Sequence, residues 1–288
     1  MNILSLQSAV AYGYVGNSAA TFPLQRLGFE VWPVDTVQFS NHPVYGQLGG
    51  DMASPNLVRA VIDGLTRLGV LGQCDAVLSG YLGDAATAPT VLDAVQQVRA
   101  LKPDAVFLCD PVMGDDTTGR YVRDGIPQFM AEHLVPAADI ITPNRFELQR
   151  LTGHDVTELA SATTAARMLL DRGPRMVVVT SLPDPAGIAC VMVTAQGAWA
   201  VRTPWLAFDP AIHGSGDCLS ALLLAHILRN APPPEALSLA VSSLFGVLEQ
   251  TLALGRRELA LVQAQNELVQ PSRLFAPEAV DVESKRHG

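Results

Sequence analysis

Residues 212–228 read IHGSGDCLSALLLAHIL, which places a Gly-Ser-Gly turn and one carboxylate directly before an apolar run of helical length. An acid at a helix start can act as a cap or as a partner of the helix dipole, a contribution of ~0.3–1 kcal/mol. That role does not require a glycine on each side of Ser215. Such a turn also leaves backbone N–H groups uncovered, and these can bind a phosphate group. Asp217 is therefore either a helix cap or a group that works beside a phosphate.

Composition and charge exclude several classes of partner. The 288 residues are 49% apolar and 16% charged, which predicts a globular chain with a large core. The net charge is −9, and no basic run occurs before the extreme C-terminus, so neither nucleic acid nor anionic lipid is expected as a partner. The start lacks a signal-peptide pattern, and no apolar run approaches about 18 residues. We therefore expect a cytoplasmic protein that does not span a membrane.

The cysteine, histidine and lysine residues limit the chemistry further. The four cysteines include no C-x-x-C pair and the six histidines form no ligand-like cluster, which argues against a zinc site and a disulfide framework. Lysine occurs only at Lys102 and Lys285, so the chain has no G-x-x-x-x-G-K-[ST] phosphate loop, and a lysine Schiff base is not expected. Phosphate binding must therefore use backbone N–H groups, arginine or a metal ion.

Short apolar runs alternate with helical periods along the chain, which is typical of βαβ units and a mainly parallel sheet. Strands are predicted at 2–8, 30–37, 75–81, 105–111, 139–144 and 175–181, with an antiparallel pair at 187–195 and 198–204. Helices are predicted at 18–27, 55–68, 87–101, 124–134, 157–172, 217–229, 234–254 and 257–268. The helix at 217–229 is apolar nearly all round, so we expect it in the interior. The polar residues from about 276 are expected to fray.

Polar side chains gather at the predicted strand ends. They are Ser8, Tyr81, Asp110, Asn144 and Thr180. In open α/β sheets, ligands bind outside the carboxyl ends of the strands. The sequence therefore predicts one cleft at this edge of the sheet, built from residues far apart in the chain.

Two further motifs carry acids that allow two interpretations. In CDPVMGDD (109–116), Asp110 ends a predicted strand, where an aspartate is more often a turn former than a metal ligand. In TPNRFEL (142–148), Asn144 and Glu147 have the spacing of a capping box at a helix start. The two acids also suit Mg²⁺, which takes few protein carboxylates, keeps several waters and bridges to nucleotide phosphates. Either motif alone is weak evidence for a metal site.

The two motifs and the glycine turn together favour phosphoryl transfer to an alcohol. That reaction needs a base, a cradle for the developing charge and a metal ion. Asp217 would be the base, the amides of 214–216 the cradle, and Asp110 and Glu147 the metal site. A dinucleotide fingerprint fits poorly, because Ser220 stands where G-x-G-x-x-G requires its last glycine and the motif lies late in the chain.

Seven stretches extend this pattern over the whole chain. They are SLQSAVAYGYVGNSAATFPLQRLGFEV (5–31), TVQFSNH (36–42), GYLG (80–83), CDPVMGD (109–115), DIITPNRFEL (139–148), VVVTS (177–181) and GSGD (214–217). Together they resemble the pyridoxal kinases of the ribokinase-like superfamily, in the same order, from about residue 2 to 275. VQFSNH and NSAATFPLQRLGFE favour this branch over the sugar kinases.

The resemblance implies both a fold and an activity. The fold would be a ribokinase-like α/β/α sandwich with a mainly parallel central sheet and an antiparallel edge. Residues 1–275 would form a single kinase domain, followed by a polar C-terminal tail at 276–288. The activity would be ATP-dependent phosphorylation of the 5′-hydroxymethyl group of pyridoxal, with pyridoxine and pyridoxamine as further substrates. A homodimer is also implied.

The resemblance assigns a substrate side to the site. Asp217 would be the general base, and Gly214, Ser215 and Gly216 the anion hole for the γ-phosphate. The residues assigned to the vitamer are Ser8, Phe39, His42, Pro43, Val44, Tyr81 and Tyr121, the last on a flap over the substrate. Several of these residues also allow a purely structural interpretation. Ser8, at a strand end, can form a hydrogen bond with its own backbone, and Phe39 can belong to the core. The DDTTGRYV loop (115–122) can be an ordinary solvent-exposed loop.

A nucleotide side is implied as well. Asp110, Thr142, Asn144, Glu147 and Thr180 correspond to positions for phosphate, metal and a monovalent cation. The ions would be Mg²⁺, held by Asp110 and Glu147, and K⁺. The segment Thr203, Pro204, Trp205 and Leu206 would border the adenine of ATP.

The chain departs from the family pattern at two positions. Many members carry threonine where this chain has Pro43, so a hydroxyl contact to the vitamer is lost there, and threonine is common in place of Ser215.

Two alternative functions remain open. They are a kinase of the hydroxymethylpyrimidine precursor of thiamin, and a non-catalytic protein that binds the B6 vitamers. Retention of Asp217, Asp110 and Glu147 argues against a pure binder.

Overall fold

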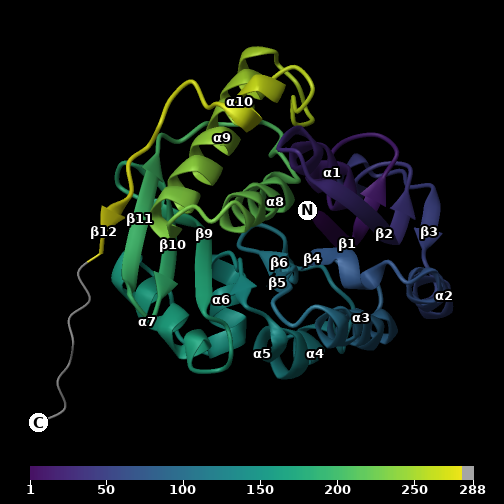
Figure 1. Ribbon diagram of the computed structural model, residues 1–288. Helices are drawn as coiled ribbons and strands as arrows, with labels where there is room; N and C mark the ends of the chain where they lie inside the picture. The colour runs from purple at the N-terminus through teal and green to yellow at the C-terminus, as the bar shows by residue number, and fades with distance from the viewer. Residues whose placement is uncertain (281–288) are drawn as a thin grey trace, which may run out of the picture.

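The computed structural model describes residues 1–280 and centres on a ten-stranded sheet in the order β3-β2-β1-β4-β5-β8-β9-β10-β11-β12 (Figure 1). The strands are β1 (Asn2–Val10), β2 (Glu30–Phe39), β3 (Gly50–Met52), β4 (Cys74–Ser79), β5 (Val106–Cys109), β8 (Ile140–Ile141), β9 (Met176–Asp184), β10 (Gly187–Thr194), β11 (Gly197–Thr203) and β12 (Glu278–Ala279). The six strands from β2 to β9 in this order pair in parallel, as predicted. The predicted antiparallel pair is β10 and β11, and β3 adds an antiparallel strand at the opposite edge.

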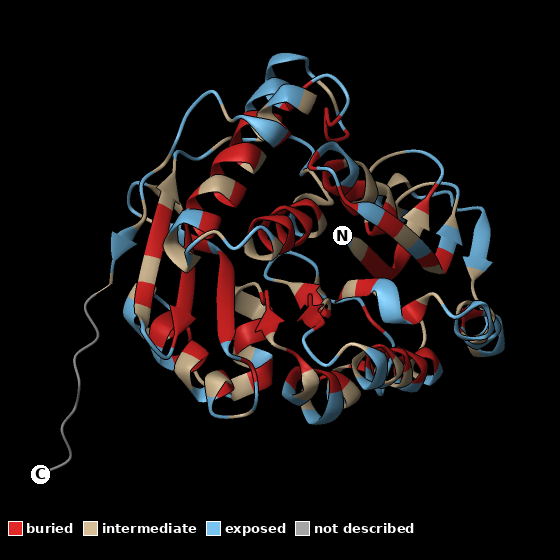
Figure 2. Ribbon diagram, viewed as in Figure 1, coloured by how far each residue is buried: buried red, intermediate tan, exposed pale blue. Residues whose placement is uncertain are grey.

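Helices cover both faces of the sheet because its strands are apolar on both sides. Their bounds are α1 (Asn17–Arg26), α2 (Pro55–Leu68), α3 (Ala88–Leu101), α4 (Ile126–Phe129), α5 (Val135–Ala137), α6 (Arg145–Thr152), α7 (Leu159–Leu170), α8 (Ser215–Leu228), α9 (Pro233–Ala253) and α10 (Gln265–Val269). One core joins α2, α3, α6 and α7 to one face, and the other joins α1, α8, α9 and α10 to the opposite face (Figure 2). The result is the α/β/α sandwich expected from the sequence.

Successive side chains along a strand point to opposite faces of the sheet and pack in different cores. In β5, Phe107 packs in the first core and Leu108 in the second, and both are fully buried. The same alternation in β9 places Val177 in the first core and Val178 in the second. Continuous apolar runs in the sequence are therefore strands that contact helices on each side.

Helix α8 lies in the interior, as its composition predicted. Its residues from Cys218 to His226 are buried, and it packs on α1 and α9. Helix α9 is long and apolar enough by composition to cross a membrane, but it packs against α8, α10 and strands β10 and β11. The apolar surface of both helices is thus largely used inside the protein.

Several predicted boundaries were wrong. The helix expected at 257–268 is limited to α10, because Gly255 (φ +59°) ends the preceding helix and the Thr251 hydroxyl accepts a hydrogen bond from the Ala260 N–H at 2.9 Å. The strand expected at 139–144 shortens to β8, since Pro143 has no N–H and the next residue caps a helix.

Two further boundaries differ from the prediction. The helix expected at 124–134 starts at Ile126 and continues through a π-helical turn (Met130–Leu134) to Ala137. In the tail, Glu278–Ala279 does not fray but pairs with β11. The rest of the predicted tail, from 281, lies outside the described residues.

Candidate active site

The Gly-Ser-Gly-Asp turn lies at the N-terminus of α8. Gly214 is the N-cap residue, and its φ of 82° is in the left-handed region that favours glycine. A Cβ atom on Gly214 would lie 1.8 Å from the carbonyl oxygen of Tyr14, so the turn packs directly on the loop that follows β1. A Cβ atom on Gly216 would meet nothing within 4 Å, so this position faces open space. The uncovered first turn therefore faces a space that can hold an anion.

Asp217 lies in the first turn of α8 and is partly buried. Burial raises the pKa of its carboxyl to about 6, and hydrogen bonds from the backbone N–H groups of Gly16 and of Asp217 itself oppose this rise. The left-handed Gly16 also touches Ser8, because a Cβ on this glycine would lie 2.5 Å from the Ser8 Oγ atom. A carboxylate with a pKa near 6 is ionised at neutral pH and still basic enough to accept a proton.

One side of this turn opens into a cavity of about 470 Å³, which is large enough for a small heteroaromatic molecule. It contains all of the residues that the sequence assigned to the vitamer: Ser8, Phe39, His42, Pro43, Val44, Tyr81 and Tyr121. Gly214 and Asp217 line the same cavity. The structure thus brings these predicted residues together around one cavity, which is called the vitamer pocket below after that prediction.

A pair of stacked imidazoles forms part of the wall of the vitamer pocket. The rings of His42 and His213 lie 4.0 Å apart between centroids, at 18°. Burial, together with a smaller effect of the neighbouring His213, lowers the pKa of His42 to about 4. Burial also lowers the pKa of His213. Both rings are therefore neutral at physiological pH and present a flat, uncharged surface.

Tyr121 follows the short hairpin of β6 (Gly114–Asp115) and β7 (Gly119–Arg120). Burial raises the pKa of its phenol, and the carboxylates of Glu147, Asp115 and Asp217 raise it further. The residue as a whole remains 44% exposed. Tyr121 is thus partly exposed to solvent and lies near the acids of the site.

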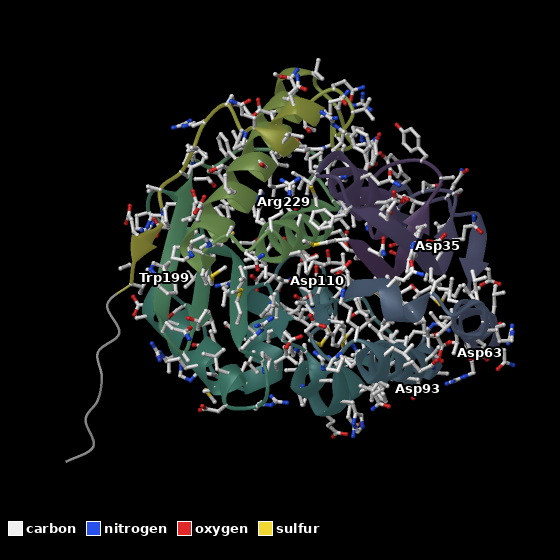
Figure 3. All side chains as sticks on the ribbon, viewed as in Figure 1. Asp35, Asp63, Asp93, Asp110, Trp199 and Arg229 are labelled. Atoms are coloured by element: carbon white, nitrogen blue, oxygen red, sulfur yellow. The ribbon has the colours of Figure 1, made fainter. Side chains whose placement is uncertain are left out.

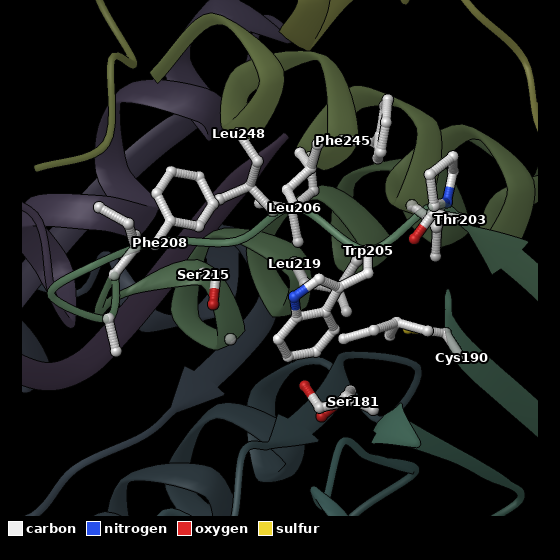
Figure 4. Close-up of a pocket in the computed structure, with 18 residues that line it drawn as sticks. Ser181, Cys190, Thr203, Trp205, Leu206, Phe208, Ser215, Leu219, Phe245 and Leu248 are labelled. Atoms are coloured by element: carbon white, nitrogen blue, oxygen red, sulfur yellow. The ribbon is translucent and has the colours of Figure 1, made fainter. Parts of the chain in front are cut away.

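The other side of the turn opens into a second cavity, of about 260 Å³. It is lined by Ser215 and Gly216 and by the predicted adenine segment, Thr203 to Leu206. Figure 4 shows Ser215 on one side of this cavity, Trp205 beneath Leu206, and Phe245 and Leu248 contributed by α9. Thr180 also lines it. We call this cavity the nucleotide pocket.

Four of the predicted residues line neither pocket. They are Asp110, Thr142, Asn144 and Glu147. Asp110 is buried at the end of β5, near the centre of Figure 3, and its Oδ2 atom accepts a hydrogen bond from the Ser220 hydroxyl at 3.0 Å. The hydroxyl oxygens of Ser220 and Thr142 lie 2.9 Å apart. Burial raises the pKa of Asp110, and the nearby Asp217 raises it further. Asp110, Ser220 and Thr142 therefore form a buried hydrogen-bonded group between the strand ends and α8.

Asn144 and Glu147 form the capping box that their spacing predicted. The Asn144 side chain accepts from the Glu147 N–H, and the Glu147 Oε2 atom accepts from the Asn144 N–H, both at 2.9 Å. The Glu147 Oε1 atom accepts from the Met113 N–H at 2.9 Å. Burial nevertheless raises the pKa of Glu147 well above its usual range, and Asp110 raises it further. Glu147 is therefore a helix cap and also one of two adjacent buried acids.

Sequence reasoning missed several residues of the two pockets. They are Asp115, Thr118 and His213 in the vitamer pocket and Ser181, Phe208, Leu219, Phe245 and Leu248 in the nucleotide pocket. His213 directly precedes the glycine turn in the sequence, so its position beside that motif could have identified it as a site residue. Phe245 and Leu248 look like ordinary core residues of a helix, so their role depends on the tertiary packing.

The fold and the arrangement of the two pockets indicate the class of enzyme. An α/β/α sandwich with a phosphate cradle between two pockets, a base on one side and two buried acids behind it, is typical of an enzyme that transfers a phosphoryl group from a nucleotide to a small alcohol.

Comparison with known proteins narrows this class. The sequence model of the phosphomethylpyrimidine kinase family matches residues 52–261. The chain is 51% identical to pyridoxal kinase PdxY of Rubrobacter xylanophilus, over 96% of each chain, and 48% identical to that of Deinococcus radiodurans, over 97% of each. Pyridoxal kinase from Leishmania donovani, solved with ADP and pyridoxamine, superposes with a TM-score of 0.91 at 31% identity and covers 97% of this chain and 99% of its own. The chain therefore belongs to the pyridoxal kinases of the phosphomethylpyrimidine kinase family.

Proposed function

We propose that this enzyme transfers the γ-phosphoryl group of ATP to the 5′-hydroxymethyl group of pyridoxal, and that it also accepts pyridoxine and pyridoxamine. The observation that carries the proposal is the position of the glycine turn. Gly214 and Asp217 line the vitamer pocket, whereas Ser215 and Gly216 line the nucleotide pocket. One short segment thus lines both pockets. Relatives named pyridoxal kinase, and neighbours solved with ADP and a vitamer, support these substrates.

The chemistry follows from this arrangement. The Asp217 carboxylate accepts the proton of the hydroxymethyl group while the alcohol oxygen forms a bond to the γ-phosphorus. The bond between that phosphorus and the β,γ-bridging oxygen breaks, and ADP leaves. The backbone N–H groups at the start of α8 stabilise the negative charge on the transferred group. Tyr121 and residues 42–44, which line the vitamer pocket, would limit the access of water to the reacting atoms.

Asp110 and Glu147 are the residues that we propose to hold Mg²⁺. Two adjacent buried acids, each with a raised pKa, are stabilised in their ionised form by a cation. Among residues 1–280 no three His, Cys, Asp or Glu side chains converge. This fits an ion that completes its shell with water and phosphate oxygens. When bound, the ion would neutralise charge on the nucleotide phosphates. K⁺ is a second proposed ion on the nucleotide side, and omission of K⁺ from the assay tests it.

The remaining proposals concern the protein as a whole. We propose that residues 1–275 act as one kinase domain and that the enzyme is a cytoplasmic homodimer. Leu57, Val61 and Leu68 on α2 expose large apolar side chains, which suits a surface that contacts another copy. Light scattering coupled to size-exclusion chromatography tests the dimer. A monomer at micromolar concentration would contradict it.

One alternative is a kinase of hydroxymethylpyrimidine, which the name of the matching family model favours. The other is a vitamer-binding protein without turnover. The test is ADP release with pyridoxal, pyridoxine, pyridoxamine or hydroxymethylpyrimidine, each with and without Mg²⁺. We expect the highest kcat/KM with a B6 vitamer. A higher value with the pyrimidine would favour the first alternative, and ADP release with none of them would favour the second.

A further inference from the structure

The 40–49 loop, between β2 and β3, supplies part of the wall of the vitamer pocket through His42, Pro43 and Val44. Most of this loop is exposed. His42 and Tyr45 are only partly exposed, because their rings turn toward the body of the protein. These two side chains therefore provide contacts between the loop and the rest of the protein.

Tyr45 is fixed by Glu258. The Tyr45 hydroxyl donates a hydrogen bond to the Glu258 Oε1 atom at 2.6 Å. This bond, with help from burial, raises the pKa of Tyr45 to about 12. The guanidinium of Arg257 lies over the Tyr45 ring, 4.9 Å from its centroid. Glu258 itself is buried, with an exposed fraction of 9%.

The second oxygen of Glu258 contacts the catalytic turn indirectly. Its Oε2 atom accepts a hydrogen bond from the Tyr14 N–H at 3.1 Å. The carbonyl of Tyr14 packs directly against Gly214, the first residue of the anion-binding turn. One carboxylate thus connects the 40–49 loop to the segment that supports the turn. Charged hydrogen bonds of this kind are stronger than neutral ones.

We infer that Glu258 is a positioning residue for the vitamer, which holds the 40–49 loop closed over the substrate through the Tyr45 hydroxyl. This inference rests on the proposed function, because it takes the larger cavity as the vitamer pocket. The stacking of His42 on His213 is a second contact that holds the same loop. None of the residues of this loop lines the nucleotide pocket. Loss of the Tyr45–Glu258 hydrogen bond should therefore weaken binding of the vitamer and leave binding of ATP unchanged.

The first test is Tyr45→Phe, which removes the hydroxyl and keeps the ring. If the closed loop is needed for binding, a smaller closed population raises the KM for pyridoxal, by about 5- to 10-fold for one lost hydrogen bond to a charged group. We expect kcat and the KM for ATP to stay within about twofold. Tyr12→Phe is the matched control, because its ring contacts the Tyr45 ring and it is 61% exposed.

Glu258 is tested by two variants. Glu258→Gln can still accept from the Tyr14 N–H and donate to the Tyr45 oxygen, so it should keep a KM for pyridoxal close to wild type. Glu258→Ala should raise that KM at least as much as Tyr45→Phe does. Hydrogen exchange of the amides at 40–49 should be faster in Tyr45→Phe than in wild type, and the melting temperature should be unchanged.

An unchanged KM for pyridoxal in Tyr45→Phe would overturn the inference, as would an equal rise in the KM for ATP. The exchange measurement needs no turnover. If the wild-type enzyme does not phosphorylate pyridoxal, the proposed function fails, and hydrogen exchange still decides whether the Tyr45–Glu258 contact holds the loop.

Discussion

The Ser220 hydroxyl donates a hydrogen bond to Asp110 at 3.0 Å, although 110 residues separate them in the chain. Ser220 is on the second turn of α8, and Asp110 directly follows the last residue of β5. The bond therefore joins the helix that carries the proposed base to the strand end that carries a proposed metal ligand. It also lowers the pKa of Asp110, against the rise caused by burial.

Ser220→Ala should weaken activation by Mg²⁺. The substitution removes a hydrogen bond that orients the Asp110 carboxylate and stabilises its ionised form, so we expect about a 10-fold higher concentration of Mg²⁺ for half-maximal activity. The KM for pyridoxal should stay the same, because Ser220 does not line the vitamer pocket. The measurement is a Mg²⁺ titration at saturating ATP and pyridoxal. An unchanged titration curve would argue against Asp110 as a ligand.

Asp217→Ala and Asp217→Asn should each lower kcat by roughly 10²-fold or more, the usual effect of a lost general base. Binding of ATP should persist, since other residues of the turn line the nucleotide pocket. Steady-state rates and nucleotide titrations measure the two effects separately. Turnover near that of wild type would leave Asp217 only a favourable charge interaction with the N-terminus of α8.

Asp217→Asn should also make the protein more stable at about pH 8. The folded-state pKa of Asp217 is raised to about 6 from its ordinary value of 3.8, so protonation favours the folded state. The resulting stability is fully present below the ordinary pKa and is lost as the pH rises through about 6. Asparagine does not titrate, so its melting temperature should exceed that of wild type by about 2–4 °C at high pH.

The difference in melting temperature between Asp217→Asn and wild type should shrink as the pH falls from about 6 toward 4. Thermal unfolding across this range checks the sign. A difference that stays constant with pH would mean that the carboxyl is not held in an unfavourable charged state.

Gly216→Ala and Gly214→Ala should separate the chemistry of the turn from its stability. A methyl group at Gly216 meets no protein atom, so the variant should fold normally but obstruct the γ-phosphate and lower kcat/KM for ATP by about 10-fold or more. A methyl group at Gly214 would collide with the Tyr14 carbonyl and require a left-handed alanine, so this variant should lose stability as well. Melting temperature and kcat/KM distinguish them. Normal activity in Gly216→Ala would place the phosphate elsewhere.

Periodicity in the sequence was sufficient to predict a mainly parallel sheet with helices between its strands, and the resemblance to the pyridoxal kinases implied the sandwich and the two sides of the candidate site. Alternating apolar runs and helical periods are local patterns, and the carboxyl ends of parallel strands must meet at one edge. Ser8, Tyr81, Asp110, Asn144 and Thr180 could therefore be assigned to one cleft from the predicted strand ends, whereas Asp217 was assigned from the glycine turn and the resemblance to the pyridoxal kinases. Of these residues, Ser8 and Tyr81 line the larger cavity and Thr180 lines the smaller one.

Segments with irregular backbone could not be predicted in this way. The apolar run at 259–261 resembles part of a helix, but the Thr251 hydroxyl and Gly255 turn the chain there, and Glu258 is buried beside Tyr14 as a result. Ser220 appeared only as a departure from a glycine motif, whereas the structure pairs it with Asp110.

Sequence alone thus determined the class of fold and predicted which residues carry reactive chemistry, because periodicity and short motifs are properties of neighbouring residues. Only the tertiary structure decided which of these residues share a pocket, which acids are buried next to each other, and how the 40–49 loop is held. Those properties depend on contacts between segments far apart in the chain, and on the removal of water from around them, which no local pattern encodes.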